Sequence, residues 1–171
     1  MRRLARLGPL RHALAFVLRP HVSLAAWMLV IAAWHIPAAY DYALTSQTVH
    51  ELEHVSFIAV GLLAWTQLVD PARRLSCRER LGCMAAMAGF ALVLGAALIT
   101  ASPLYPSYAH ESVRLFGIGP ARDQQLAGLI MIGEQLLALG LCAWFLFPGR
   151  PELRRRPRLQ HRPLSSLWRP T

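Results

Sequence analysis

The chain has 171 residues, of which 55% are apolar and only 16% are charged, and its formal net charge is +9. The charged residues are confined to blocks between long apolar runs, which excludes an ordinary soluble domain and indicates an integral membrane protein. All 18 basic residues are arginines that mostly flank apolar segments, so the positive charge indicates membrane topology and no nucleic-acid partner.

Four apolar segments approach the roughly 20 residues that are needed to cross a bilayer. In chain order they cover about residues 22–40, 50–69, 81–101 and 124–147. They predict an all-α fold, a four-helix transmembrane bundle formed by residues 22–147. Residues 1–21 are then a basic cytoplasmic N-terminal segment that is not cleaved, and residues 148–171 are an Arg/Pro-rich cytoplasmic tail without fixed structure.

The arginines fix the predicted orientation of the bundle. Five precede the first segment, four lie between the second and third, and seven follow the fourth, whereas the other two connections hold only Arg114 and Arg122. Arginine accumulates on the cytoplasmic side of bacterial membrane proteins, so both termini are predicted to be cytoplasmic. The two arginine-poor connections, which are rich in acids, then face outward.

Three histidines lie near the predicted outer ends of the first two segments. His35 is close to the end of the first, and His50 and His54 open the second, four residues apart and therefore on one helix face. Ionisable side chains at such depths usually face a bundle interior or a wet cavity. Three imidazoles at one depth predict a metal site, to which Asp123 at the start of the fourth segment would contribute.

The fourth segment carries a second polar feature. Gln124, Gly128, Met131 and Gln135 follow a helical spacing, and Glu134 lies beside them near the expected midplane. An unpaired carboxylate is costly there, so Glu134 is expected to be protonated or hydrogen-bonded inside the bundle. The thioether of Met131 would suit Cu(I). In the third segment, small residues at Gly82, Ala85, Ala86 and Gly89 predict close helix packing.

Residues His50 to His54 also match the pattern H-E-x-x-H of zinc peptidases, in which the glutamate after the first histidine is the general base. A membrane zinc metallopeptidase is therefore an alternative function. A subunit that binds haem or quinone between paired histidines is a further alternative. The cysteines Cys77, Cys83 and Cys142 form no C-x-x-C pair and predict no disulfide framework.

Four strings, in this order, resemble the CtaG family of bacterial cytochrome c oxidase assembly factors, the type associated with caa-type oxidases. They are WHIPAAYD at Trp34–Asp41, VHELEHVSF at Val49–Phe57, PLYP at Pro103–Pro106 and DQQLAGLIM at Asp123–Met131. The resemblance spans about residues 20–147. It implies a multi-pass protein of the bacterial plasma membrane, without enzymatic turnover, that helps to mature a haem-copper oxidase and contacts its subunits and membrane lipids.

The resemblance also implies a role at the copper centre of the oxidase, and the site predicted above from the residues, His35, His50, His54 and Asp123, would then supply or position the copper. Two departures from the family pattern bear on this expectation. Longer members have additional helices before the first motif, one with further histidines. Either a partner protein supplies that part here, or the chain is a divergent or truncated relative. The string MIGEQ at Met131–Gln135 replaces a more apolar continuation.

Overall fold

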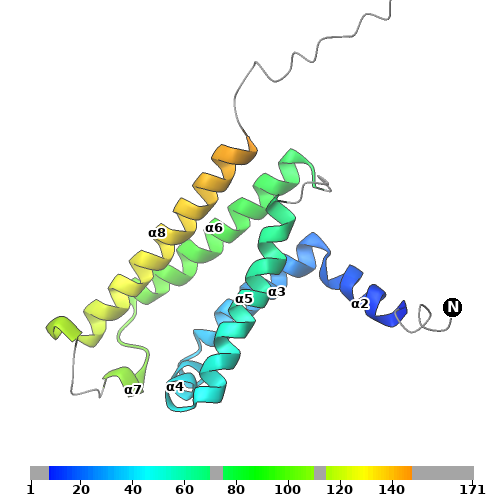
Figure 1. The fold of residues 1–171 in the computed structure, drawn as a ribbon. Helices are drawn as coiled ribbons and strands as arrows, with labels where there is room; N and C mark the ends of the chain where they lie inside the picture. The colour runs from blue at the N-terminus through cyan, green and yellow to red at the C-terminus, as the bar shows by residue number, and fades with distance from the viewer. Residues whose placement is uncertain (1–7, 70–74, 110–114, 148–171) are drawn as a thin grey trace, which may run out of the picture.

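The computed structural model describes residues 8–69, 75–109 and 115–147, and these ranges contain helices and short connections with no β-strand. The all-α prediction is therefore confirmed for these residues. The elements, shown in Figure 1, are α2 (Gly8–Val17), α3 (Pro20–Trp34), α4 (Pro37–Thr45), α5 (Gln47–Val69), α6 (Cys77–Thr100), α7 (Pro106–Ala109), the short 3-10 helix η1 (Leu115–Gly117) and α8 (Pro120–Leu146). The predicted tail 148–171 lies outside the described residues.

Three helices, α5, α6 and α8, are long and apolar enough to cross a membrane, and they correspond to the second, third and fourth predicted segments. A fourth span is possible only if α2 and α3 are counted together, and these two helices meet at an angle of 73°. Helix α3 alone has 15 residues, about 22 Å at 1.5 Å per residue, which is less than the roughly 30 Å core of a bilayer.

The first predicted segment is not one continuous helix, because it breaks between α3 and α4. Pro37 has no N–H to continue the helix, and the residue before a proline is driven out of the helical region. Ile36 is accordingly extended at φ −67° and ψ 127°, and Pro37 starts α4. The N–H of His35 turns back to the carbonyl of Ala32, which closes α3 with a tighter turn.

The helices pack as two pairs, α3 with α5 and α6 with α8. Figure 1 shows the pairs meeting where α5 leads into α6 and diverging toward the end where α4 and α7 lie. The buried core lies where the two helix pairs meet. It consists of Trp27, Val60, Ala64, Leu68, Met84, Met87, Leu139 and Cys142. Leu68 is completely buried and Met87 nearly so, as expected of side chains in an apolar interior.

We call the end of the molecule where the two helix pairs meet, around Leu68 and Met87, the closed end. This end also buries a charged side chain. The guanidinium of Arg80, in the first turn of α6, donates to the carbonyls of Leu68 and Leu75. It therefore satisfies a carbonyl at the end of α5, where a helix leaves its last carbonyls without intrahelical partners. A cation is also favoured at a helix C-terminus by the helix dipole.

Helices α6 and α8 approach most closely at Gly95 and Gly128. A Cβ at Gly128 would lie 2.8 Å from the carbonyl oxygen of Gly95, so a side chain there would separate the two backbones. The prediction that the stripe around Gly82 and Gly89 provides the close contact is wrong, since a Cβ at either glycine meets nothing within 4 Å. The close crossing is formed instead half a helix further on, near the opposite end of the molecule.

Candidate functional site

The break between α3 and α4 determines how His35 is presented. The ring Nδ1 lies 2.7 Å from the carbonyl oxygen of Ile31, one turn earlier. A carbonyl can only accept, so Nδ1 carries the proton and donates, and in the neutral ring the lone pair is on Nε2. A histidine whose one nitrogen is oriented by a backbone carbonyl is a common arrangement for metal ligation or proton transfer at the other nitrogen.

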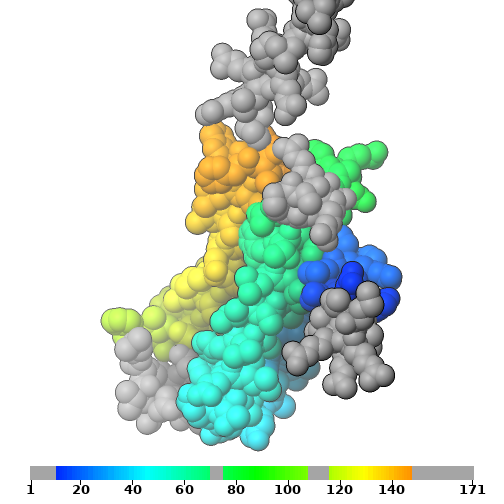
Figure 2. Space-filling view, turned by 45° about the vertical axis from the view of Figure 1, so that its right-hand side comes forward, coloured from blue at the N-terminus to red at the C-terminus, as the bar shows by residue number. Residues whose placement is uncertain are grey.

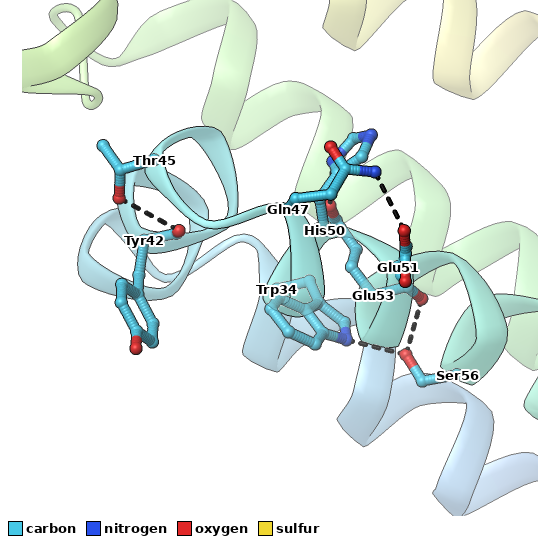
Figure 3. A network of polar contacts seen from close by, with 8 residues as sticks. All are labelled: Trp34, Tyr42, Thr45, Gln47, His50, Glu51, Glu53 and Ser56. Atoms are coloured by element: carbon cyan, nitrogen blue, oxygen red, sulfur yellow. Dashed lines mark hydrogen bonds and ion pairs between the residues drawn. The ribbon is translucent and has the colours of Figure 1, made fainter.

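A chain of hydrogen bonds connects α3 to α5 beside this histidine (Figure 3). The indole N–H of Trp34 donates to the hydroxyl of Ser56 at 2.8 Å, and that hydroxyl donates to the backbone carbonyl of Glu53 at 2.7 Å. Because both bonds are partly buried, they fix the position of the first turns of α5 relative to the end of α3. The residues of α5 that face this contact are thereby held near His35.

The first turns of α5 bring three candidate ligands together. One ligand atom each from His50, Glu53 and His54 lies within 4.8 Å of the others. The rings of His50 and His54 are 4.5 Å apart between centroids, and Nδ1 of His50 is 3.5 Å from a carboxylate oxygen of Glu53. Helical spacings of three and four place these side chains on one face. The side chain of His50 is 47% exposed and that of Glu53 only 13%, so the group is open on its histidine side.

Glu51 does not join this group. Its carboxylate is exposed and accepts a 3.0 Å hydrogen bond from the side-chain amide of Gln47, one turn back on α5 (Figure 3). The H-E-x-x-H pattern needs this glutamate as the base next to the metal. In the structure Glu53, and not Glu51, is the carboxylate beside the histidines, so the geometry does not support the peptidase alternative.

A cavity of about 250 Å³ lies next to this group, at the end of the molecule opposite the closed end. We call this region the cavity end. Residues from α3, α4, α5, α6 and α8, and from the connections after α3 and before α7, line the cavity. They are Trp34, His35, Tyr40, Glu53, Phe57, Leu98, Pro103, Tyr105, Pro120, Asp123, Gln124 and Ala127. Glu53 therefore belongs both to the cavity wall and to the group with the two histidines.

Gln124 holds the α8 side of the cavity in place. Its buried side chain accepts from the N–H of Leu104 at 2.8 Å and donates to the carbonyl of Leu98 at 2.9 Å, with longer contacts to the carbonyls of Ala101 and Ser102. One amide thus satisfies both donors and acceptors left by the end of α6. It fixes the connection that carries Tyr105 into the cavity wall.

Tyr105 closes the cavity from the side of α4. Its ring packs on that of Tyr40 at 4.1 Å between centroids, and its hydroxyl donates to the backbone carbonyl of His35 at 3.5 Å. Partial burial raises the pKa of Tyr105, and the nearby Tyr40 and Asp41 raise it further because they disfavour a second negative charge. The phenol therefore stays neutral and remains a hydrogen-bond donor over the physiological pH range.

The structure divides the predicted metal residues into two neighbouring sets. His50 and His54 lie together with Glu53, whereas His35 and Asp123 lie on the wall of the adjoining cavity. Among the described residues, the group of three ligands includes neither His35 nor Asp123. Glu53 was not singled out from the sequence, although its spacing of three from His50 and its place before His54 could have indicated it. His110, which the sequence places on the same outward-facing side, lies outside the described residues.

The predicted polar stripe on α8 contributes to helix packing and not to a set of metal ligands. Gln124 and Gly128 are buried against α6, and Met131 and Gln135 are half-buried. Met131 does not line the cavity. Of the two alternatives expected for Glu134, a hydrogen bond inside the bundle is wrong for the described residues, because the side chain is exposed and none of them pairs with it. The other alternative, a protonated Glu134, stays a prediction. Successive residues of a helix lie about 100° apart around its axis, so Glu134 points away from the side of α8 on which Gln135 is half-buried.

Three membrane-length apolar helices and a cavity lined by histidine and carboxylate side chains together define a helical membrane protein with a polar site at one end. Residues 1–150 match the family model of the cytochrome c oxidase caa3 assembly factor (Caa3_CtaG). The chain therefore belongs to this family, as the four sequence motifs indicated. Neither the curated proteins nor the solved structures gave a match to the chain.

Proposed function

We propose that this protein supports the assembly of a caa3-type cytochrome c oxidase in the bacterial plasma membrane by holding copper at the cavity end. Membership of the family supports the assembly role. The observation that carries the copper role is the group formed by His50, Glu53 and His54 beside the cavity. The protein acts as a carrier or positioning factor and catalyses no turnover of its own.

Whether copper fits this site depends on the donor atoms that the residues offer. Two imidazoles and one carboxylate suit a divalent copper ion, and imidazoles alone also hold Cu(I). His50, His54 and Glu53 would hold the ion, and the bound metal would supply the redox-active centre that the oxidase incorporates. Across the cavity, the free Nε2 of His35 and the carboxylate of Asp123 offer a second set of donors on the path toward a recipient protein.

The cavity end faces the outside of the cell in this proposal, and both termini face the cytoplasm. The arginine distribution supports this orientation, since sixteen of the 18 arginines precede the first apolar segment, lie between the second and third, or follow the fourth. A topology reporter fused after Cys77 or Thr171 should report the cytoplasm. A reporter inserted at Ser46 or Ser107 should report the outside, and the reverse result would contradict an external copper site.

The copper role is tested by measuring copper bound to the purified full chain in detergent, by competition with a coloured Cu(I) chelator and by elemental analysis. We expect one ion per chain, and a loss of affinity of at least about tenfold for His50→Ala or His54→Ala. The matched control is His21→Ala, because His21 is also exposed and on a helix but lies away from the cavity.

The same variants should be scored in host cells by oxidase activity under limiting copper. Wild type, His21→Ala and Glu51→Gln should restore the activity, whereas His50→Ala and His54→Ala should not. Oxidase that assembles normally with the double histidine variant would contradict the copper role. Loss of assembly with Glu51→Gln at unchanged metal content would instead favour a peptidase.

A further inference from the structure

Helix α8 carries one carboxyl group in its middle, Glu134. It is the fifteenth of the 27 residues of Pro120–Leu146, so it lies about 21 Å from the start of a helix about 40 Å long. The hydrocarbon core of a bilayer is about 30 Å thick. When α8 spans the membrane, Glu134 therefore lies close to the centre of the core.

The face of α8 that bears Glu134 is uncovered. The neighbouring side chains on this face are large, apolar and exposed: Ile130 by 67%, Leu137 by 65% and Leu141 by 51%. Within residues 8–69, 75–109 and 115–147, no side chain or backbone group pairs with the carboxyl group. Figure 2 shows the surface of α8, yellow to orange, open along one edge of the molecule.

A carboxyl group that faces acyl chains is costly, since lipid offers neither water nor a hydrogen-bond donor. We propose that this face of α8 docks a transmembrane helix of another polypeptide, and that Glu134 pairs there with a basic or hydrogen-bond-donating side chain at mid-membrane depth. Leucine and isoleucine side chains around it supply the packing surface, and the carboxylate supplies the specificity. This inference is independent of the copper role.

Charge complementarity favours a different polypeptide over a second copy of this chain. The described arginines of the long helices lie at the helix starts, Arg78 and Arg80 on α6 and Arg122 on α8. Helix α5 has no arginine or lysine. A second copy would therefore bring no cation to mid-depth, and in a parallel α8 pair it would bring a second carboxyl group instead of a basic one.

The position of the face also connects it with the cavity. Asp123, Ala127 and Glu134 follow spacings of four and seven, which place them on one side of α8. Asp123 and Ala127 line the cavity. A helix that packs along this side of α8 would therefore extend from Glu134 at mid-membrane to the cavity end, and would place its own end next to the cavity.

The test uses the full chain in phosphatidylcholine vesicles together with synthetic polyleucine transmembrane peptides that carry arginine, asparagine or leucine at their centre. Association is measured by fluorescence energy transfer between a label on the chain and one on the peptide. We expect the arginine and asparagine peptides to associate roughly five- to thirty-fold more strongly than the leucine peptide, as for one interhelical polar contact. Glu134→Leu should abolish this preference, and Glu134→Gln should keep it for asparagine.

The matched control moves the carboxyl group to another side of the helix at nearly the same depth. In the double variant Glu134→Leu with Leu136→Glu, the carboxyl group replaces a leucine that is 45% exposed and about 160° away around the helix. This variant should lose the preference, because the packing surface around residue 134 is no longer next to the charge. Equal association of the arginine peptide with wild type and with this variant would overturn the proposed docking face.

Two further outcomes also decide the proposal. Equal association of all three peptides with the wild-type chain would overturn it. Energy transfer between two labelled copies of the chain that is lost in Glu134→Leu would also overturn it, in favour of a homodimer. Copper affinity should be unchanged in Glu134→Leu, so a failure of the docking proposal is distinguishable from a failure of the copper proposal.

Discussion

The closed end and the cavity end of this protein use polar residues in opposite ways. At the closed end, Arg80 is buried and its guanidinium donates to the carbonyls of Leu68 and Leu75, next to a dry core that includes Leu68 and Met87. At the cavity end, His35, Glu53 and Asp123 surround a cavity of about 250 Å³ and keep donor or acceptor capacity free. The described polar groups of the closed end are satisfied and only stabilise it, whereas the cavity end also keeps groups with capacity to bind a ligand.

The largest effect is expected at Gln124, because this residue both stabilises the fold and forms part of the cavity wall. Gln124→Leu leaves the N–H of Leu104 and the carbonyl of Leu98 without their partner, which should cost about 3 kcal/mol of unfolding free energy. It should also release Tyr105 from the cavity and weaken copper binding. Unfolding in mixed micelles and copper titration measure the two effects. Gln125→Leu, at an exposed neighbour, is the control and should change neither.

A purely stabilising role is predicted for Arg80. Arg80→Leu removes the charged donor from a buried carbonyl at the end of α5, and should lower the unfolding free energy by about 2 kcal/mol. Copper affinity should stay within a factor of two of wild type, because the substitution lies at the opposite end. The exposed Arg78 provides the control through Arg78→Leu, which should have little effect on stability. If Arg80→Leu weakened copper binding instead, the two ends would not be independent.

For Glu53 we predict a large effect on copper binding and a small effect on stability. Glu53→Gln keeps the size of the side chain and removes the negative charge beside His50 and His54, so it should weaken copper binding about tenfold. The unfolding free energy should change by less than about 0.5 kcal/mol, since the bond from Ser56 goes to the backbone carbonyl of Glu53 and is unaffected. Unchanged copper affinity would remove Glu53 from the ligand set. Glu51→Gln is the control on the same helix.

The smallest effect concerns Tyr105, whose pKa is raised above the usual value near 10 by partial burial and by Tyr40 and Asp41. The neutral phenol is favoured in the folded state, so its contribution to stability is complete below the usual tyrosine pKa and is lost as the pH rises through the raised one. The ultraviolet difference spectrum between wild type and Tyr105→Phe should show a phenol that ionises at higher pH than free tyrosine. A phenol that ionises at or below the usual value would mean that the cavity end is more open to water than the structure shows.

Much of the architecture could be predicted from the sequence because bilayer-length apolar runs leave few alternatives. The helices α5, α6 and α8 lie where the three later runs predicted them, and the family was evident from four motifs. The first segment was mispredicted although Pro37 is visible in the sequence. Proline breaks a helix in water but is tolerated in many membrane helices, so its presence alone does not decide between a kink and an end.

The site itself was predicted only in part. The spacing of His50 and His54 placed them on one face, since a helix fixes which residues are neighbours on it. The way α3 packs against α5 cannot be read from either helix alone, because it depends on the hydrogen bond from Trp34 to Ser56. That packing decided that His35 faces the cavity together with Asp123. Within α5, the side-chain conformations decided that Glu53, not Glu51, is the carboxylate beside the histidines, because Glu51 pairs with Gln47 instead.

The sequence by itself determined that this is a helical membrane protein, its family and the shared helix face of His50 and His54, because composition, spacing and motifs are local properties of the chain. Only the tertiary structure decided which of those residues lie together, and that Glu134 is exposed on α8. The physical reason is that the rotation of each helix about its axis is set by packing, as between Gly95 and Gly128, and not by its own sequence.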